Sequence, residues 1–117
     1  MTEAEMKQRT KAFALRVIRL VNSLSTDLAS RRLGDQLLRS GTSVGANYRA
    51  ACRAKSKADF ISKLGIVEEE ADESAFWMEL LIDSGLVPQS RLDKLLDEAN
   101  QLTAIVVASR KSAAGLQ

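Results

Sequence analysis

The sequence has no histidine, one proline, one cysteine and only 4% aromatic residues. Without histidine it lacks the usual general base, the Ser-His and Cys-His nucleophile pairs and the Glu-x-x-His ligands of di-iron bundles. Gly41 and Gly45 are not followed by the Lys-Ser/Thr pair of a phosphate-binding loop. We therefore expect a protein that is not an enzyme, with no catalytic residue, no cofactor and no metal.

Long apolar runs are also missing. None approaches the roughly 20 residues that span a bilayer, and residues 1–11 are too polar for a signal peptide. The single cysteine, Cys52, cannot form an internal disulfide, which is typical of a reducing compartment. These observations predict a cytoplasmic protein without a membrane partner. The 117 residues fit one domain, residues 1–117.

The sequence does contain apolar residues at helical spacing. They recur three and four positions apart in four stretches, which predicts helices over about residues 3–24, 30–53, 57–84 and 88–109. Ser56 and Asp59 resemble a capping box, Gly85 can end a helix, and Pro88 suits the first turn of the next. We expect the tail from Ser109 to fray. Short connections between long amphipathic helices predict an all-α, antiparallel up-down-up-down four-helix bundle.

Two glycines lie inside the second predicted helix, where each costs about 0.5–1 kcal/mol relative to alanine. Gly41 and Gly45 are four residues apart and share a face with Ser40, Ser43 and Ala46. Such a patch of small residues lets another backbone approach closely, from the same chain or from a neighbouring subunit. A helix break between Ser40 and Ser43 is the alternative.

Charge is divided unevenly between the two halves. Residues 1–63 hold 13 Lys/Arg against 5 Asp/Glu, whereas residues 64–117 hold 4 against 10. The candidate binding surface is the basic run Arg49, Arg53, Lys55 and Lys57, which Arg31, Arg32 and Lys63 could extend. Lys and Arg at this density would neutralise phosphates without reading a base sequence. Helix packing or self-association would explain the same asymmetry without a ligand.

Other chemically notable residues have simpler explanations. The acidic run Glu68, Glu69, Glu70, Asp72 and Glu73 could hold a divalent cation, but a face towards solvent or towards basic residues of the first two helices explains it better. We expect Glu70 or Glu73 to turn inward. Cys52 is expected to be a packing residue, and Trp77 a core or subunit contact.

The segment Gln36–Arg49 (QLLRSGTSVGANYR), followed by Arg53, Ser56, Phe60, Leu64, Glu73 and Gly85, resembles the four-helix-bundle family encoded in 23S rRNA intervening sequences. The resemblance implies a ring-shaped homopentamer with a proposed role in nucleic-acid binding. The chain is also similar to the accessory variability determinant protein of diversity-generating retroelements, which has the same bundle and works with a reverse transcriptase and its RNA.

The resemblance also implies a set of polar positions. Gln36, Arg39, Ser43 and Asn47 match the polar stripe of the family's second helix, and Glu73 matches its acidic position on the third. We hypothesise an Arg39–Glu73 pair, with Ser43 and Asn47 nearby, that fixes helix register or a subunit interface. Ala50 and Ala51 stand where the family usually has Glu and Gly, which makes the local surface more basic.

These arguments predict a non-enzymatic oligomer, pentameric by resemblance, that binds the RNA or DNA backbone with little sequence preference. The residues expected to bind nucleic acid are Arg39, Arg49, Arg53, Lys55 and Lys57. The alternative is a protein-interaction scaffold, or an accessory subunit of a nucleic-acid-processing complex. In that case the Gly41/Gly45 patch and the acidic third helix build interfaces.

Overall fold

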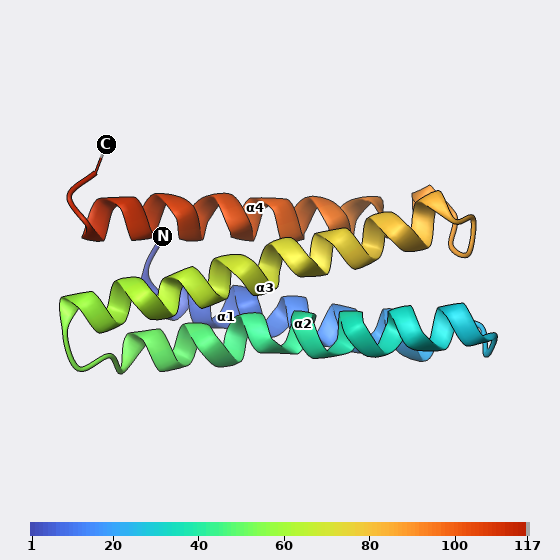
Figure 1. The fold of residues 1–117 in the computed structure, drawn as a ribbon, viewed down its shortest axis with the longest axis horizontal. Helices are drawn as coiled ribbons and strands as arrows, with labels where there is room; N and C mark the ends of the chain where they lie inside the picture. Colours follow the sequence, from blue (N-terminus) through green and yellow to red (C-terminus); the bar gives the residue numbers. More distant parts are fainter. Residues whose placement is uncertain (117) are drawn as a thin grey trace.

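The computed structural model describes residues 1–116, which form helices and no strand. The helices are α1 (Glu3–Asn22), α2 (Leu28–Cys52), α3 (Lys57–Asp83) and α4 (Gln89–Ala113). Successive helices run in opposite directions along the molecule's long axis, which measures 45 Å (Figure 1). The predicted all-α, up-down-up-down four-helix bundle is confirmed.

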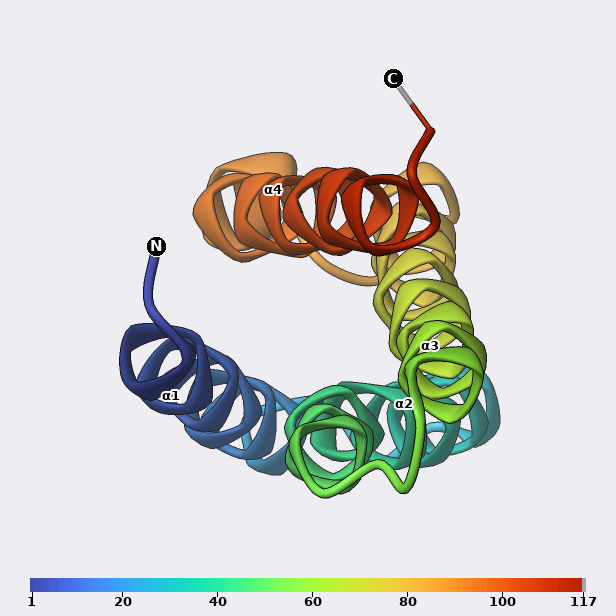
Figure 2. The same cartoon turned by 90° about the vertical axis from the view of Figure 1, so that its left-hand side faces the viewer.

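The helices are arranged in chain order. Viewed end-on they lie along an open arc, with α1 and α4 as its two ends (Figure 2). Helices that follow one another in the chain pack most extensively. The open side is bridged by Arg9 of α1, whose Nε and Nη2 donate to the two carboxylate oxygens of Glu98 of α4, each at 2.7 Å. This ion pair therefore closes the bundle between its first and last helices.

The core consists of the apolar stripes that the spacing predicts. Buried side chains come from all the helices, and the largest fully buried ones are Phe13, Leu37, Leu64, Met78, Leu81, Leu92 and Leu102. Polar side chains are also buried, among them Ser40 of α2 and Ser74 of α3. The hydroxyl of Ser74 donates to that of Ser40 at 3.0 Å, so the buried polar pair is hydrogen-bonded.

Local hydrogen bonds set where the helices begin. Thr2 and Glu5 form a complete capping box at the start of α1. The carboxylate of Asp27 accepts from the backbone N–H of Ser30 at 2.9 Å and begins α2. Ser56 accepts from the N–H of Asp59 at 3.0 Å, as the sequence suggested. The Asp59 carboxylate accepts from the N–H of Lys55 instead of completing a box, at 3.1 Å.

The contact between α1 and α2 explains the two glycines of α2. A Cβ atom added to Gly41 would lie 2.8 Å from both methyl groups of Val17, and one added to Gly45 would lie 3.2 Å from Oγ1 of Thr10. The backbone that approaches Gly41 and Gly45 is therefore α1 of the same chain. The sequence had left open whether it comes from the same chain or from a neighbouring subunit. Helix α2 is continuous from Leu28 to Cys52, so the break considered at Ser40–Ser43 is wrong.

Several predicted helix ends need correction. α1 ends at Asn22 rather than 24, and α2 begins at Leu28 rather than 30, because Asp27 takes the capping position. Pro88 is the residue before α4 and not part of its first turn. α4 continues to Ala113 instead of fraying from Ser109, because Gly115 adopts a left-handed conformation (φ 77°) and the N–H of Leu116 caps the carbonyl of Lys111.

Candidate nucleic-acid interface

Four of the five residues expected to contact nucleic acid lie together at one end of the bundle. Arg49 is in the last turn of α2, Arg53 follows that helix, Lys55 is in the α2–α3 connection and Lys57 is the first residue of α3. All four side chains are exposed. None has a carboxylate within ion-pair distance among residues 1–116, so their charges are available to an external anion.

Arg39, the fifth residue, lies elsewhere and is already engaged. Its guanidinium contacts the carboxylates of Glu70, at 3.2 Å, and Glu73 on the facing helix α3. The same Glu73 carboxylate accepts from the indole N–H of Trp77 at 3.1 Å. Two acidic neighbours compensate the charge of Arg39, so it contributes little to a phosphate-binding surface and instead connects α2 to α3.

The other members of the predicted polar stripe make mostly local bonds. The hydroxyl of Ser43 donates to the carbonyl of Arg39 at 2.7 Å, and the amide of Asn47 donates to the carbonyl of Ser43 at 2.8 Å. Gln36 accepts a long 3.4 Å bond from Arg39. The structure thus brings Arg39 and Glu73 together, while Ser43 and Asn47 bond within α2. The buried hydrogen bond between α2 and α3 joins Ser74 to Ser40. The sequence analysis did not predict it.

The residues suggested as extensions of the basic run do not extend it. Arg31 and Arg32 lie in the first turns of α2, at the opposite end from Arg53. At 1.5 Å per residue, the helix separates Arg31 from Arg53 by about 33 Å. Lys63 is one turn along α3 from Asp59, with which it forms an ion pair of 2.7 Å. None of these residues therefore joins the four cations at the α2–α3 end.

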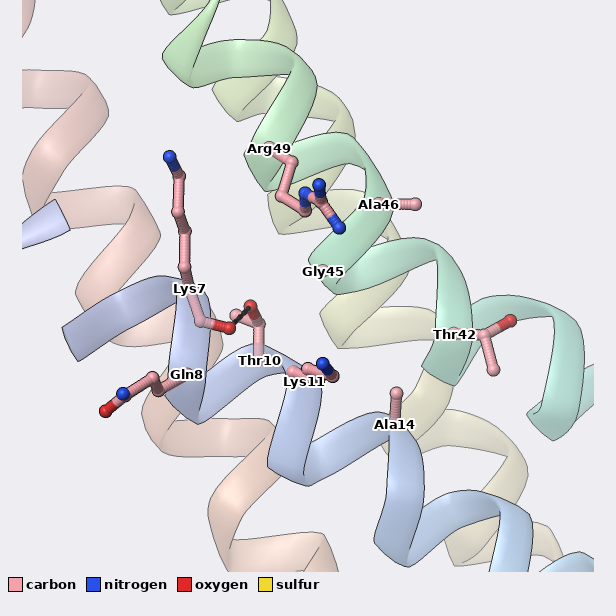
Figure 3. A pocket seen from close by; sticks show the side chains of 9 residues that line it. All are labelled: Lys7, Gln8, Thr10, Lys11, Ala14, Thr42, Gly45, Ala46 and Arg49. Atoms are coloured by element: carbon pink, nitrogen blue, oxygen red, sulfur yellow. Dashed lines mark hydrogen bonds between the residues drawn. The ribbon is translucent and has the colours of Figure 1, made fainter. Parts of the chain in front are cut away.

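Two lysines of α1 that are outside the basic run also join the site. A groove of about 410 Å³ runs between α1 and α2 next to Arg49, and Lys7 and Lys11 of α1 line it with Arg49 (Figure 3). We call this the α1/α2 groove. Small residues also line it, among them Ala14, Thr42, Gly45 and Ala46. The groove therefore combines cationic side chains with small residues that allow a ligand to approach the helix backbones.

The small residues of the groove include Gly45, which lies at the close approach of the two helices. Thr10 is fully buried, and its hydroxyl donates to the carbonyl of Met6 at 2.9 Å, so the polar atom next to Gly45 is satisfied within α1. Lys7 and Lys11 are one helical turn apart and lie on one face of α1. Their i, i+4 spacing was visible in the sequence, but only the pairing of α1 with Gly45 places them beside Arg49.

Electrostatic partners limit what the nearby groups can do. Lys7 forms an exposed ion pair with Glu3 at 3.1 Å, and this contact lowers the pKa of the Glu3 carboxyl. Burial raises the pKa of the Cys52 thiol, with a further contribution from Glu3, so the thiol stays protonated at neutral pH. A protonated thiol is a poor nucleophile. Cys52 therefore offers packing rather than covalent chemistry.

The acidic residues of α3 do not form a cation site. Within the described part of the chain, no three His, Cys, Asp or Glu residues gather as they would around a metal ion. Glu70 and Glu73 face Arg39. Glu68 pairs with Arg110 of α4 at 2.9 Å. The expected partner, solvent or a basic residue of the first two helices, is therefore wrong for Glu68. Residues 1–116 also include no helix long and apolar enough to cross a membrane.

Comparisons with known proteins point to one family. A family model described as 23S rRNA-intervening sequence protein matches residues 2–108. A crystal structure of a protein with unknown function from the S23 ribosomal protein family of Bacteroides thetaiotaomicron is similar at 33% sequence identity, with a TM-score of 0.84. The alignment covers 95% of this chain and 99% of that chain. None of the curated proteins matches.

Proposed function

Because this chain belongs to the 23S rRNA-intervening sequence protein family, we propose that it is a non-enzymatic bundle that binds the phosphate backbone of RNA or DNA. The observation that carries this proposal is a group of cations towards one end of the bundle that form no ion pair within residues 1–116. Lys11 and Arg49 line the α1/α2 groove, and Arg53, Lys55 and Lys57 continue from it along the α2–α3 connection. Cations in this arrangement bind phosphates and release counterions.

The chemistry of the site favours binding over catalysis. The groove offers Lys and Arg side chains, small residues and the amide of Gln8, but no acid–base pair. Contacts of this kind position a backbone and carry little base specificity.

We further propose a cytoplasmic homo-oligomer, with a pentamer as the state that the family resemblance implies. A ring of subunits would repeat the groove and increase the number of phosphates that one nucleic acid contacts.

The test is nucleic-acid binding by fluorescence anisotropy at several salt concentrations, on protein whose mass in solution has been measured. For a duplex the logarithm of the association constant should fall with the logarithm of salt concentration with a slope of roughly −0.9 per phosphate contacted. The variant Arg49→Glu/Arg53→Glu/Lys57→Glu should bind at least tenfold more weakly. It should also show a shallower slope, because it removes phosphate contacts.

A matched control separates this site from net charge. The variant Arg19→Glu/Arg31→Glu/Lys94→Glu makes the same change in charge with exposed residues that lie away from the α2–α3 end. It should bind nearly as well as the native protein once salt screens distant charges. Equal losses in both variants would indicate that charge alone governs binding, and no binding by native protein at low salt would refute the proposal.

A second candidate function, docking of a protein partner, rests on the outer face of α3. Glu69, Asp72, Phe76, Glu79 and Asp83 are exposed and spaced three and four residues apart, so they share one face. Phe76 is 50% exposed and packs edge-to-face against Trp77. An exposed aromatic ring among carboxylates suits a basic protein segment, whether from a second copy or from another protein. Tight capture of such a partner without nucleic-acid binding would favour this function.

A further inference from the structure

A second depression lies at the end of the bundle where α2 gives way to α3. It has a volume of about 340 Å³, and we call it the loop-end hollow. Along the connection, Cys52, Ala54 and Ser56 line the hollow. The residues that alternate with them, Arg53, Lys55 and Lys57, are exposed. The basic run found in the sequence therefore lies in the same connection as this hollow, next to the residues that line it, although its own side chains do not line it.

Two aromatic rings form the walls of the loop-end hollow, Tyr48 from α2 and Phe60 from α3. Both are partly buried and pack against the hydrophobic core, so each ring is held in place while part of its surface faces the hollow. The chain's other aromatic residues do not lie beside the basic run, because Phe13 is buried and the Phe76–Trp77 pair is on the outer part of α3. Aromatic surface and unpaired cations thus meet only here within residues 1–116.

The polar groups of the hollow suit a nucleobase better than a phosphate. Glu3 of α1 lines it, and its carboxyl has a lowered pKa through the contact with Lys7, so it is an ionised acceptor at neutral pH. A carboxylate repels phosphate but accepts hydrogen bonds from the amino groups of bases. Burial raises the pKa of Tyr48 to about 12, so its phenol remains neutral.

We propose that the loop-end hollow receives an unpaired base of single-stranded RNA or DNA, while Arg53, Lys55 and Lys57 contact the phosphates on either side. The inference rests on the proposed nucleic-acid function and adds a preference for single strands. Aromatic rings stack on bases of any sequence, and neighbouring cations contact the backbone. A duplex cannot use the hollow, because its bases are stacked inside the helix.

The experiment compares a labelled 12-nucleotide single strand with a duplex of the same sequence. Phe60→Leu and Tyr48→Leu remove an aromatic face while keeping an apolar side chain. Each should weaken single-strand binding by about fivefold or more, which is the lower end for losing one base stack, and leave duplex binding unchanged. Phe76→Leu, an equivalent change at an exposed ring on α3, should have no effect on either ligand.

Two further measurements do not depend on the leucine variants folding. Phe60→Tyr retains the ring and should bind the single strand like native protein. A strand containing 2-aminopurine should lose fluorescence when the native protein binds, because stacking quenches this base analogue, whereas the corresponding duplex should not change. A mononucleotide that displaces the strand at equal nucleotide concentration would overturn the assignment to a strand.

The outcomes distinguish the two proposals. Equal binding of single strand and duplex, with no quenching and no effect of the leucine variants, would overturn the loop-end hollow as a base site and leave backbone binding intact. Failure of the native protein to bind either ligand would overturn both. A single-strand preference that disappears with Phe60→Leu and persists with Phe76→Leu would support the assignment.

Discussion

At the scale of single residues, two glycines inside helices differ in the space around them. A Cβ atom on Gly41 would lie 2.8 Å from the methyl groups of Val17, a side chain that is fully buried and cannot move aside easily. A Cβ atom on Gly65, in the middle of α3, would have no neighbouring atom within 4 Å. The first glycine permits helix contact, whereas the second only weakens its own helix.

We therefore predict opposite effects of the same substitution at these positions. Gly41→Ala should lower the free energy of unfolding by about 1–3 kcal/mol, because the added methyl overpacks the α1–α2 contact. Gly65→Ala should raise it by about 0.5–1 kcal/mol through helix propensity. Urea unfolding followed by circular dichroism measures both. Similar changes of the same sign would contradict the role assigned to Gly41.

The sequence already indicated that Gly41 and Gly45 admit a close neighbour, but it could not identify that neighbour. A patch of small residues has the same pattern whether it receives a helix of its own chain or of another subunit. The identity depends on which helices lie next to one another in space. Only the structure shows that Val17 and Thr10 of α1 occupy these positions.

At the scale of helices, the apolar stripes were predictable and the ends were less so. The stripes depend on a periodicity that extends over many residues, so a few exceptions do not obscure it. The start of α2 depends on one residue among several that can cap a helix, since Ser25, Thr26, Asp27 and Ser30 occur close together. Asp27 is the cap because its carboxylate accepts from both the backbone N–H and the hydroxyl of Ser30.

The cap at Asp27 should make stability depend on pH in the acid range. The hydroxyl of Ser25, with the backbone N–H of Ser30, lowers the pKa of Asp27 from 3.8 to about 2. The unfolded chain therefore takes up a proton at higher pH than the folded chain. The stabilisation from this carboxylate is complete above about pH 4 and is lost as the pH falls towards about 2.

Asp27→Asn tests this expectation, because asparagine can cap a helix but does not titrate. At pH 7 the native protein should have the higher urea midpoint. The difference should shrink between about pH 4 and about pH 2, the interval over which the folded and unfolded pKa values of Asp27 apply. A difference in midpoint that stays constant across this range would show that the charge of Asp27 does not stabilise α2.

At the scale of the whole molecule, an ion pair links the first and last helices of the bundle, which also share its hydrophobic core. Arg9 and Glu98 are far apart in the sequence, and their side chains are only 27% and 14% exposed. The Arg9 guanidinium also contacts Gln101 at 2.7 Å. The contact with Glu98 raises the pKa of Arg9, consistent with stabilisation of the charged form.

Removing one partner should therefore destabilise the bundle. Arg9→Met leaves the Glu98 carboxylate without its cation and should lower the free energy of unfolding by about 1–3 kcal/mol. Amides of α1 should exchange with deuterium faster than those of α2 and α3. The double variant Arg9→Met/Glu98→Leu should recover much of the loss, because an apolar pair leaves no unpaired charge. A single variant as stable as the native protein would exclude a role for this pair in closing the bundle.

The candidate site could be predicted only in part, because residues far apart in the sequence are brought together by the fold. The run from Arg49 to Lys57 is contiguous in the sequence, so its charge was evident there. Lys7 and Lys11 are remote in the sequence and join the site because α1 runs antiparallel to α2. Arg39 belongs to the same charge pattern, but Glu70 and Glu73 of α3 neutralise it.

The start of α1, the end of α4 and the α2–α3 connection all lie at the same end of the molecule (Figure 1). An affinity tag or fusion partner at either terminus would therefore stand beside the basic residues and the loop-end hollow. Immobilising the protein on a sensor chip through such a tag would turn these residues towards the chip. A dye attached in the α1–α2 or α3–α4 connection, at the far end, would leave them open to solution.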